Sequence, residues 1–147
     1  MRVWAAFASM EGVKVLGLDV GEVRIGVAVA EEGRPFAFGR GWIVRGDLAS
    51  DVARVRELAE REGAARVVVG LPLRTGGEEG AQAAKVRRFA RALEAEGLEV
   101  RFVDERFTTH LAVRRLAHLP RKKRQEKGRR DEAAAVAILE TYLEGGA

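Results

Sequence analysis

The stretch LGLDVGEVRIGVAVA, residues 16–30, decides how the chain begins to fold. Its apolar residues alternate on both sides of a short turn at Gly21–Glu22, which is the period-two pattern of two paired strands. Asp19 stands near the end of the first of these strands, among apolar and glycine residues. Burying a bare carboxylate is costly, so Asp19 should be paired, protonated or bound to a cation. One structural alternative is an ion pair with Arg24 across the turn.

The size and composition of the chain predict one folded domain. The chain has 147 residues, of which 47% are hydrophobic, and this is enough for a substantial core. We expect one domain over residues 1–147, with a disordered leader over residues 1–12 and with a start at Met10 instead of Met1 as an open alternative. The sequence has no apolar run of transmembrane length, so we expect no membrane partner. It also lacks cysteine, which excludes thiolate metal sites and fits a cytoplasmic protein.

Positive charge is concentrated in RKKRQEKGRR, residues 121–130, which holds seven Lys or Arg against one Glu. Such a run indicates a solvated, mobile loop, a clamp for a nucleic acid backbone, or both, because Lys and Arg that meet phosphates release counterions. The candidate phosphate-binding residues are Arg121, Lys122, Lys123, Arg124, Lys127, Arg129 and Arg130.

Beyond the first two strands, the sequence predicts strands and helices in alternation. The expected elements are a strand over 35–44, a helix over 47–63, a strand over 66–73, a helix over about 79–96, a strand over 98–105, a helix from Thr108 or Thr109 to about His118, and a last helix over 131–144. Asp47 is the expected N-cap of the first helix and Gly63 its stop.

This order of elements predicts an α/β fold with a mixed five-stranded sheet. Three strands form an antiparallel meander, and two more arrive through helical crossovers, which are almost always right-handed. The simplest sheet has the first strand in its centre and helices on both faces. Three strands then run parallel, and their carboxyl ends meet at one edge, where open α/β sheets place their sites. Asp19, Leu71–Pro72 and Asp104–Glu105 fall at that edge.

Three carboxylates are candidates for a site at this edge. Asp19 and Glu105 lie at the ends of two strands, and Asp131 heads the predicted buried face of the last helix. Taken singly, Glu105 is compatible with a surface salt bridge and Asp131 with stabilisation by the helix dipole. Together they would repel one another unless cations were bound, and Mg²⁺ or Mn²⁺ suits a set of oxygen ligands. Two such ions form a clamp for in-line displacement at phosphorus, which indicates a phosphodiester substrate.

Four segments in order resemble the YqgF family, also called RuvX. They are LGLDVGEVRIGVAVA, VVVGLPLRTGGEEGAQAAKVRRFA, VRFVDERFTT and DEAAAVAILETYLE, and the resemblance runs from about residue 13 to 144. It implies an RNase H-like fold. It also implies a metal-dependent nuclease that matures the 5′ end of pre-16S rRNA, with a Holliday junction resolvase acting on DNA as the alternative. The ribosome is a further expected partner.

The resemblance also implies roles for individual residues. Asp19, Glu105 and Asp131 match the family's acidic residues and would be the catalytic triad and metal ligands. The expected cleft-shaping residues are Gly21, Gly70, Leu71 and Pro72, of which the last three match the family's GLP loop. Lys85 and Arg88 would contact phosphates, although a solvated helix face is the alternative. Glu132 replaces a residue that is often small in the family, and we interpret it as a surface residue rather than an extra ligand.

Two other classes of protein are alternatives to a nuclease. DVGEVRIGVAVA, residues 19–30, also resembles the first phosphate loop of sugar kinases and actin-like proteins, but those proteins need a second domain to enclose the nucleotide. A ribosome-assembly factor that binds nucleic acid without cleaving it would suit the basic segment, whereas aligned carboxylates would weaken its contact with a phosphate backbone. RNA and DNA remain alternative substrates, and monomer and homodimer remain alternative states.

Overall fold

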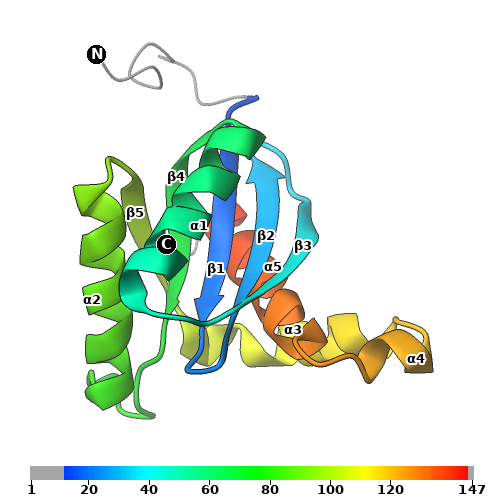
Figure 1. The fold of residues 1–147 in the computed structure, drawn as a ribbon. Coiled ribbons are helices and arrows are strands. Elements are labelled where there is room, and N and C mark those ends of the chain that lie inside the picture. The colour runs from blue at the N-terminus through cyan, green and yellow to red at the C-terminus, as the bar shows by residue number, and fades with distance from the viewer. Residues whose placement is uncertain (1–11, 146–147) are drawn as a thin grey trace.

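The computed structural model of the protein describes residues 12–145. The predicted leader lies, apart from Gly12, outside the described residues, as does the choice between Met1 and Met10. The described chain is built around one sheet in the order β3-β2-β1-β4-β5 (Figure 1). Its strands are β1 (Lys14–Val20), β2 (Arg24–Glu31), β3 (Ala37–Val44), β4 (Ala64–Leu71) and β5 (Glu99–Asp104).

The pairing of the strands confirms the predicted mixed sheet. β1 is antiparallel to β2, which is antiparallel to β3, and these strands form the meander. On its other side β1 is parallel to β4, which is parallel to β5. The first strand is therefore central, and the carboxyl ends of β1, β4 and β5 lie at the same edge of the sheet, as the sequence predicts (Figure 1).

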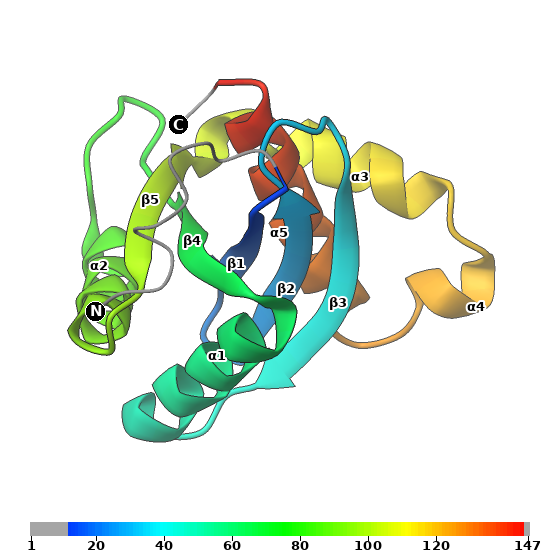
Figure 2. The same ribbon diagram turned by 90° about the horizontal axis from the view of Figure 1, so that it is seen from above.

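Helices cover both faces of the sheet, which also confirms the prediction (Figure 2). The helices are α1 (Leu48–Glu62), α2 (Ala81–Ala95), α3 (Thr109–Ala117), α4 (Arg121–Arg124) and α5 (Arg129–Leu143), with a short 3-10 helix η2 (Glu105–Phe107) after β5. α1 and α2 bury Val55, Phe89 and Leu93 on one face, while α5 buries Ala135, Ile138 and Leu139 on the other. No helix in the described part of the chain is long and apolar enough to cross a membrane.

Local capping sets the ends of α1 as the sequence predicts. The side chain of Asp47 accepts a hydrogen bond from the backbone N–H of Ser50 at 2.8 Å, which satisfies one of the free donors of the first turn. Gly63 follows the helix with φ 74°, a left-handed conformation that glycine adopts at little cost. The predicted α2 and β5 are one or two residues too long at each end, as is usual where helices and strands fray.

Two glycines bring α5 unusually close to the sheet. A Cβ atom on Gly26 of β2 would lie 1.8 Å from the backbone oxygen of Asp131, and one on Gly17 of β1 would lie 2.4 Å from Cγ of Leu139. Any larger residue at Gly26 would push the first turn of α5 away, because the obstructing atom belongs to the backbone. These glycines thus fix the position of Asp131 over the carboxyl end of β1.

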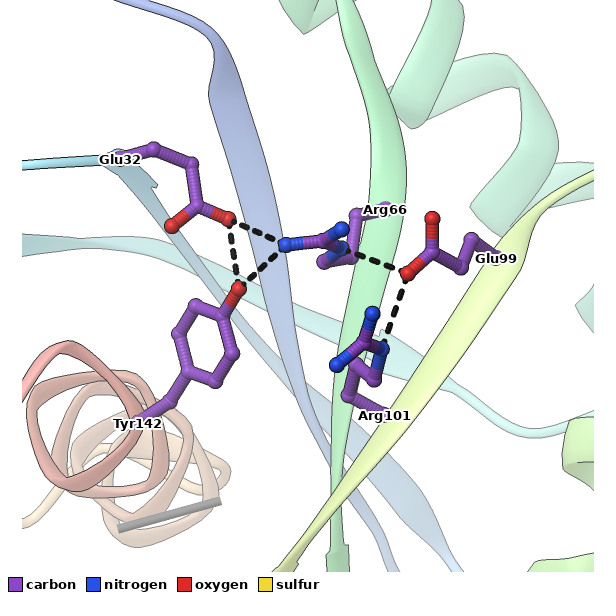
Figure 3. Close-up of polar contacts among 5 residues, drawn as sticks. All are labelled: Glu32, Arg66, Glu99, Arg101 and Tyr142. Atoms are coloured by element: carbon purple, nitrogen blue, oxygen red, sulfur yellow. Dashed lines mark hydrogen bonds and ion pairs between the residues drawn. The ribbon is translucent and has the colours of Figure 1, made fainter. Parts of the chain in front are cut away.

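A network of charged side chains joins the opposite end of the sheet (Figure 3). Arg66, at the beginning of β4, donates to Glu32 at 3.1 Å, to the Tyr142 hydroxyl at 2.6 Å and to Glu99 at 2.9 Å. Tyr142 in turn donates to Glu32 at 2.6 Å, and Arg101 donates to Glu99 at 2.9 Å. The network ties β4 and β5 to α5 and to the end of β2, and each of its two carboxylates accepts from an arginine.

The basic segment 121–130 differs from its prediction. The expectation of one loop is wrong, because Arg121–Arg124 forms α4 and Arg129 and Arg130 belong to α5. Pro120 stands at the N-cap position of α4, where the missing N–H of proline costs no helical hydrogen bond. Gly128, with φ 86°, makes the turn into α5. α4 lies beyond α3 and away from the sheet (Figure 1).

Candidate active site

Three acidic side chains from distant parts of the sequence line one pocket at the carboxyl ends of the parallel strands. Asp19 lies near the end of β1, Glu105 directly follows β5, and Asp131 lies in the first turn of α5. The pocket has a volume of about 940 Å³. The structure therefore brings together the three carboxylates that the sequence predicts as the site.

Burial and repulsion make the charged form of Asp19 unfavourable. Burial, a hydrogen bond with Glu105 and the negative charges of Glu105 and Asp131 together raise the pKa of Asp19 from 3.8 to about 9, and burial is the largest of these causes. At neutral pH Asp19 therefore keeps its proton unless a cation replaces it.

Gly70 allows Glu105 to reach Asp19. Gly70 of β4 is paired with Val103 of β5, and a Cβ atom on it would lie 2.8 Å from Cγ of Glu105. The Glu105 side chain thus passes over a position that has no side chain of its own. Among the predicted cleft-shaping residues, Gly70 has this clear steric role.

The other predicted cleft-shaping residues lie elsewhere. Gly21 closes the β1–β2 turn, where its N–H donates to the oxygen of Arg24 at 3.0 Å. Leu71 is buried in the core beneath α1 and α2. Among the described residues that line the pocket, neither Leu71 nor Pro72 is present. Leu71 and Pro72 instead shape the carboxyl end of β4, at the edge of the sheet where the site lies.

Arg24 binds Asp131 and not Asp19. Its Nε donates to Oδ2 of Asp131 at 2.9 Å, so the alternative of an Asp19–Arg24 ion pair is wrong. The reason is the position of α5, whose first turn lies against Gly26 of β2 and thereby comes within reach of Arg24. Arg24 is a member of the site that the sequence analysis missed in this role, because its partner is 107 positions away.

The donor set fits a hard divalent cation. All three acidic side chains offer carboxylate oxygens, the ligands that Mg²⁺ and Mn²⁺ prefer. The raised pKa of Asp19 reflects its burial and its two acidic neighbours. No three acidic or histidine side chains in the described part of the chain are already gathered closely enough to hold a metal together. Without a cation, the proton on Asp19 and the ion pair between Arg24 and Asp131 reduce the negative charge of the site.

Part of the basic segment faces the same pocket. Arg124, Lys127 and Arg130 line it, opposite an apolar wall that includes Ala112 and Leu116 of α3. The remaining predicted phosphate-binding residues are exposed on α4 and α2, and they are Arg121, Lys122, Lys123, Lys85 and Arg88. Lys85 is paired with the exposed Glu22 at 2.9 Å.

Arg129 does not face the pocket, which contradicts its predicted contact with nucleic acid. Its guanidinium donates to Glu132 and, at 3.0 Å, to Glu126, and it lies over the ring of Trp42 at 5.2 Å from the centroid. Only 17% of the side chain is exposed. Arg129 therefore fastens the start of α5 to β3, where Gly128 leaves room for the Trp42 ring.

Glu132 is not the surface residue that the sequence analysis expects. Its side chain is 13% exposed and accepts a hydrogen bond from the backbone N–H of Gly41 at 2.6 Å. A Cβ atom on Gly39 would lie 2.5 Å from Oε2 of Glu132, so glycine in β3 makes the space for this contact. Glu132 caps the outer edge of the sheet, and it is not among the described residues that line the pocket.

Comparison with known proteins establishes the family. Residues 13–145 match the family described as "RuvX: Holliday junction resolvase". The chain belongs to the RuvX family. A relative of this RuvX chain from Thermus thermophilus, named "Putative pre-16S rRNA nuclease", is 54% identical over 134 residues, which cover 91% of this chain and 99% of the relative. Ribonuclease YqgF of Deinococcus radiodurans is 47% identical over 129 residues, which cover 88% and 86%.

A solved structure confirms the RNase H-like fold of the RuvX chain. Thermus thermophilus RuvC, solved in complex with a Holliday junction substrate, superposes with a TM-score of 0.61 at 18% identity and covers 92% of this chain and 97% of its own. Together with the family, this fold makes the RuvX chain a hydrolase of the nuclease class, a class that binds nucleic acid and depends on divalent metal ions.

Proposed function

We propose that the chain cleaves phosphodiester bonds of RNA at the pocket formed by Asp19, Glu105 and Asp131, with the 5′ region of pre-16S rRNA as its substrate. The observation that carries this proposal is the convergence of three carboxylates, one of them with a strongly raised pKa, at the carboxyl ends of β1 and β5. The choice of RNA rests on the relatives, which are named as a pre-16S rRNA nuclease and as a ribonuclease. A cytoplasmic site of action goes with this proposal and agrees with the absence of cysteine.

The three carboxylates would hold Mg²⁺ or Mn²⁺. Bound as a pair of ions, these metals supply activation of a water molecule and neutralisation of the charge that develops at phosphorus. Asp19 would lie between the other ligands, because it is hydrogen-bonded to Glu105 and feels the charge of Asp131. Asp19, whose raised pKa keeps it protonated at neutral pH, would have to give up its proton to act as a metal ligand.

The cations around the pocket would bind and orient the substrate. Arg24, at 2.9 Å from Asp131, is placed to contact a phosphate oxygen next to the reacting one. Arg124, Lys127 and Arg130 line the same pocket and would hold the neighbouring phosphates. The apolar wall of α3 would exclude water from one side of the cleft.

Cleavage of two labelled substrates tests this proposal. Wild type, Asp19→Asn and Glu57→Gln would each be given a 5′-extended 16S rRNA precursor and a four-way DNA junction, with Mn²⁺ or with EDTA. Glu57 is the matched control, because it is exposed on α1 and paired with Arg61. We expect metal-dependent cleavage of the RNA by wild type and Glu57→Gln, and a loss of roughly 100-fold or more in Asp19→Asn, the scale at which removal of a group that stabilises the transition state acts.

The same experiment decides between the proposal and its competitors. Cleavage of the DNA junction alone would favour the resolvase activity that the family's description carries. Cleavage by Asp19→Asn at the wild-type rate would remove the carboxylates from the mechanism. Binding of RNA without cleavage by wild type would favour an assembly factor that acts on the ribosome without cutting its RNA.

A further inference from the structure

A second pocket lies at the opposite end of the sheet, beside the outer strand β3. It has a volume of about 360 Å³ and is separate from the carboxylate pocket, with which it shares no lining residue among the described ones. Two phenylalanines and three cations line it, and they are Phe36, Phe38, Lys14, Arg34 and Arg40.

The two phenylalanines are exposed on the same side of the strand. Phe36 is 64% exposed and Phe38 is 58% exposed, whereas Ala37 between them is buried against the α5 side of the sheet. In an extended chain, residues two positions apart are roughly 6.6 Å apart, and each of the two rings offers a face on which a base can stack. Large exposed apolar side chains that are grouped in this way mark an interaction site.

The charges at the pocket favour a polyanion. Arg34 pairs with Glu31 at 2.9 Å, Arg40 with Glu62 at 3.1 Å, and Lys14 with the same Glu62 at 3.7 Å. Three cations thus face two carboxylates. The cations themselves are open to solvent, with 41% of the Lys14 and Arg40 side chains and 72% of the Arg34 side chain exposed, so phosphate groups can reach them.

The edge of β3 is poorly suited to a second copy of the chain. Strands at the edge of a sheet pair with one another through free N–H and C=O groups. Here the N–H of Gly41 is bonded to Glu132 at 2.6 Å, and the C=O of Val44 accepts from Arg54 at 3.0 Å. These contacts occupy the part of β3 beyond the pocket, and at the pocket the exposed groups of the strand include the two aromatic rings.

We propose that this pocket is a stacking site for unpaired nucleotides of the RNA substrate, with the bases on Phe36 and Phe38 and the backbone along Arg34, Arg40 and Lys14. Aromatic rings surrounded by cations are the usual means of binding single-stranded RNA. The rings face the side of the sheet that α1 covers, since Ala37 between them is buried with α5, whereas the carboxylate pocket is lined by residues of α3 and α5. A single strand that reaches both sites therefore passes around the outer strand β3, at the edge of the sheet. The inference rests on the proposed RNA substrate, and it adds a place where the unpaired part of that substrate is held.

Binding in the absence of metal tests the stacking site without any cleavage. Labelled oligouridine and a blunt RNA hairpin would be titrated with wild type, the double variant Phe36→Ala/Phe38→Ala, the double variant Phe36→Tyr/Phe38→Tyr and Val44→Ala, all in EDTA. Val44 is the matched control, because it is a 60% exposed apolar residue of the same strand. We expect the alanine variant to lose at least about tenfold in affinity for oligouridine, since stacking on one ring alone is worth about that much. The tyrosine variant and Val44→Ala should bind oligouridine as wild type does, and hairpin affinity should be unchanged.

Two outcomes would overturn the stacking site. One is equal affinity of wild type and the alanine variant for oligouridine. The other is a wild type that sediments as a dimer and an alanine variant that sediments as a monomer, which would make this face an interface between copies. If oligouridine binding depends on the phenylalanines while the precursor is not cleaved by wild type, the stacking site stands and the proposed cleavage falls.

Discussion

The two ends of the parallel strands differ in whether their acidic side chains are neutralised by cations. At the end where β4 and β5 begin, Glu32 accepts from Arg66, and Glu99 accepts from Arg66 and Arg101 (Figure 3). The cations lower the pKa of Glu99 although burial opposes them. At the carboxyl ends of these strands, burial and the acidic neighbours raise the pKa of Asp19 to about 9 instead of lowering it.

This difference separates a structural cluster from a functional one. A balanced set of charges stabilises the sheet and needs no bound ion to neutralise it. A set of half-buried carboxylates with too few cations costs stability, and such a cost is found where a ligand is to be bound. Both clusters lie on the same strands. The difference in charge balance between them is therefore not explained by one part of the sheet being more buried than another.

The largest expected effect is the pH dependence of the acidic end. The folded-state pKa of Asp19 is raised from 3.8 to about 9, so its contribution to stability is full below pH 3.8 and is lost as the pH rises towards 9. Asp19→Asn removes this loss. In EDTA, the variant should become more stable than wild type by a margin that grows from pH 5 to pH 9, by at most about 1.4 kcal/mol per pH unit. Urea unfolding at pH 5, 7 and 9 measures the margin, and a margin independent of pH would contradict the explanation.

Arg66→Ala should have the next largest effect, with the opposite sign. It leaves Glu32, Glu99 and the Tyr142 hydroxyl without their shared donor, and we expect a loss of about 2 kcal/mol in the free energy of unfolding. Arg101→Ala is the matched control, because Arg101 is half-exposed and bonds to Glu99 alone within the network. Chemical denaturation of both variants should show a clear loss only for Arg66→Ala. Equal losses would mean that the network is not the stabilising unit.

A smaller effect is expected for Arg24→Gln. The change removes the cation from Asp131 and should lower stability without metal by about 1 kcal/mol, since the pair is partly exposed. A double-mutant cycle with Asp131→Asn measures the coupling between the two side chains. If the effects of the two substitutions simply add, Arg24 and Asp131 are not coupled. Arg24 would then not neutralise Asp131.

Local patterns in the sequence predict much of the fold and the three carboxylates. Alternation in residues 16–30 gives β1 and β2, and Asp47 and Gly63 set the ends of α1. The rule that parallel strands share an edge then brings Asp19 and Glu105 together. These predictions succeed because each depends on short-range geometry or on a strong topological preference.

The errors concern contacts that depend on how α5 packs against β2 and β3. Arg24 pairs with Asp131, and Glu132 bonds to Gly41, only because glycines let this helix approach the sheet closely. Nothing local in the sequence shows that approach. The run of Lys and Arg over 121–130 has no apolar periodicity, so neither α4 nor the burial of Arg129 could be predicted from it.

Thermal unfolding of wild type and Asp19→Asn, each in EDTA and in Mn²⁺ at pH 8, tests most directly whether the acidic end is built to bind a cation. In EDTA the variant should unfold at a higher temperature than wild type, because it lacks a buried carboxylate beside Glu105 and Asp131. Mn²⁺ should raise the Tm of wild type through binding to the folded state and leave Asp19→Asn almost unchanged. An equal rise in both proteins, or a variant less stable than wild type in EDTA, would contradict the account.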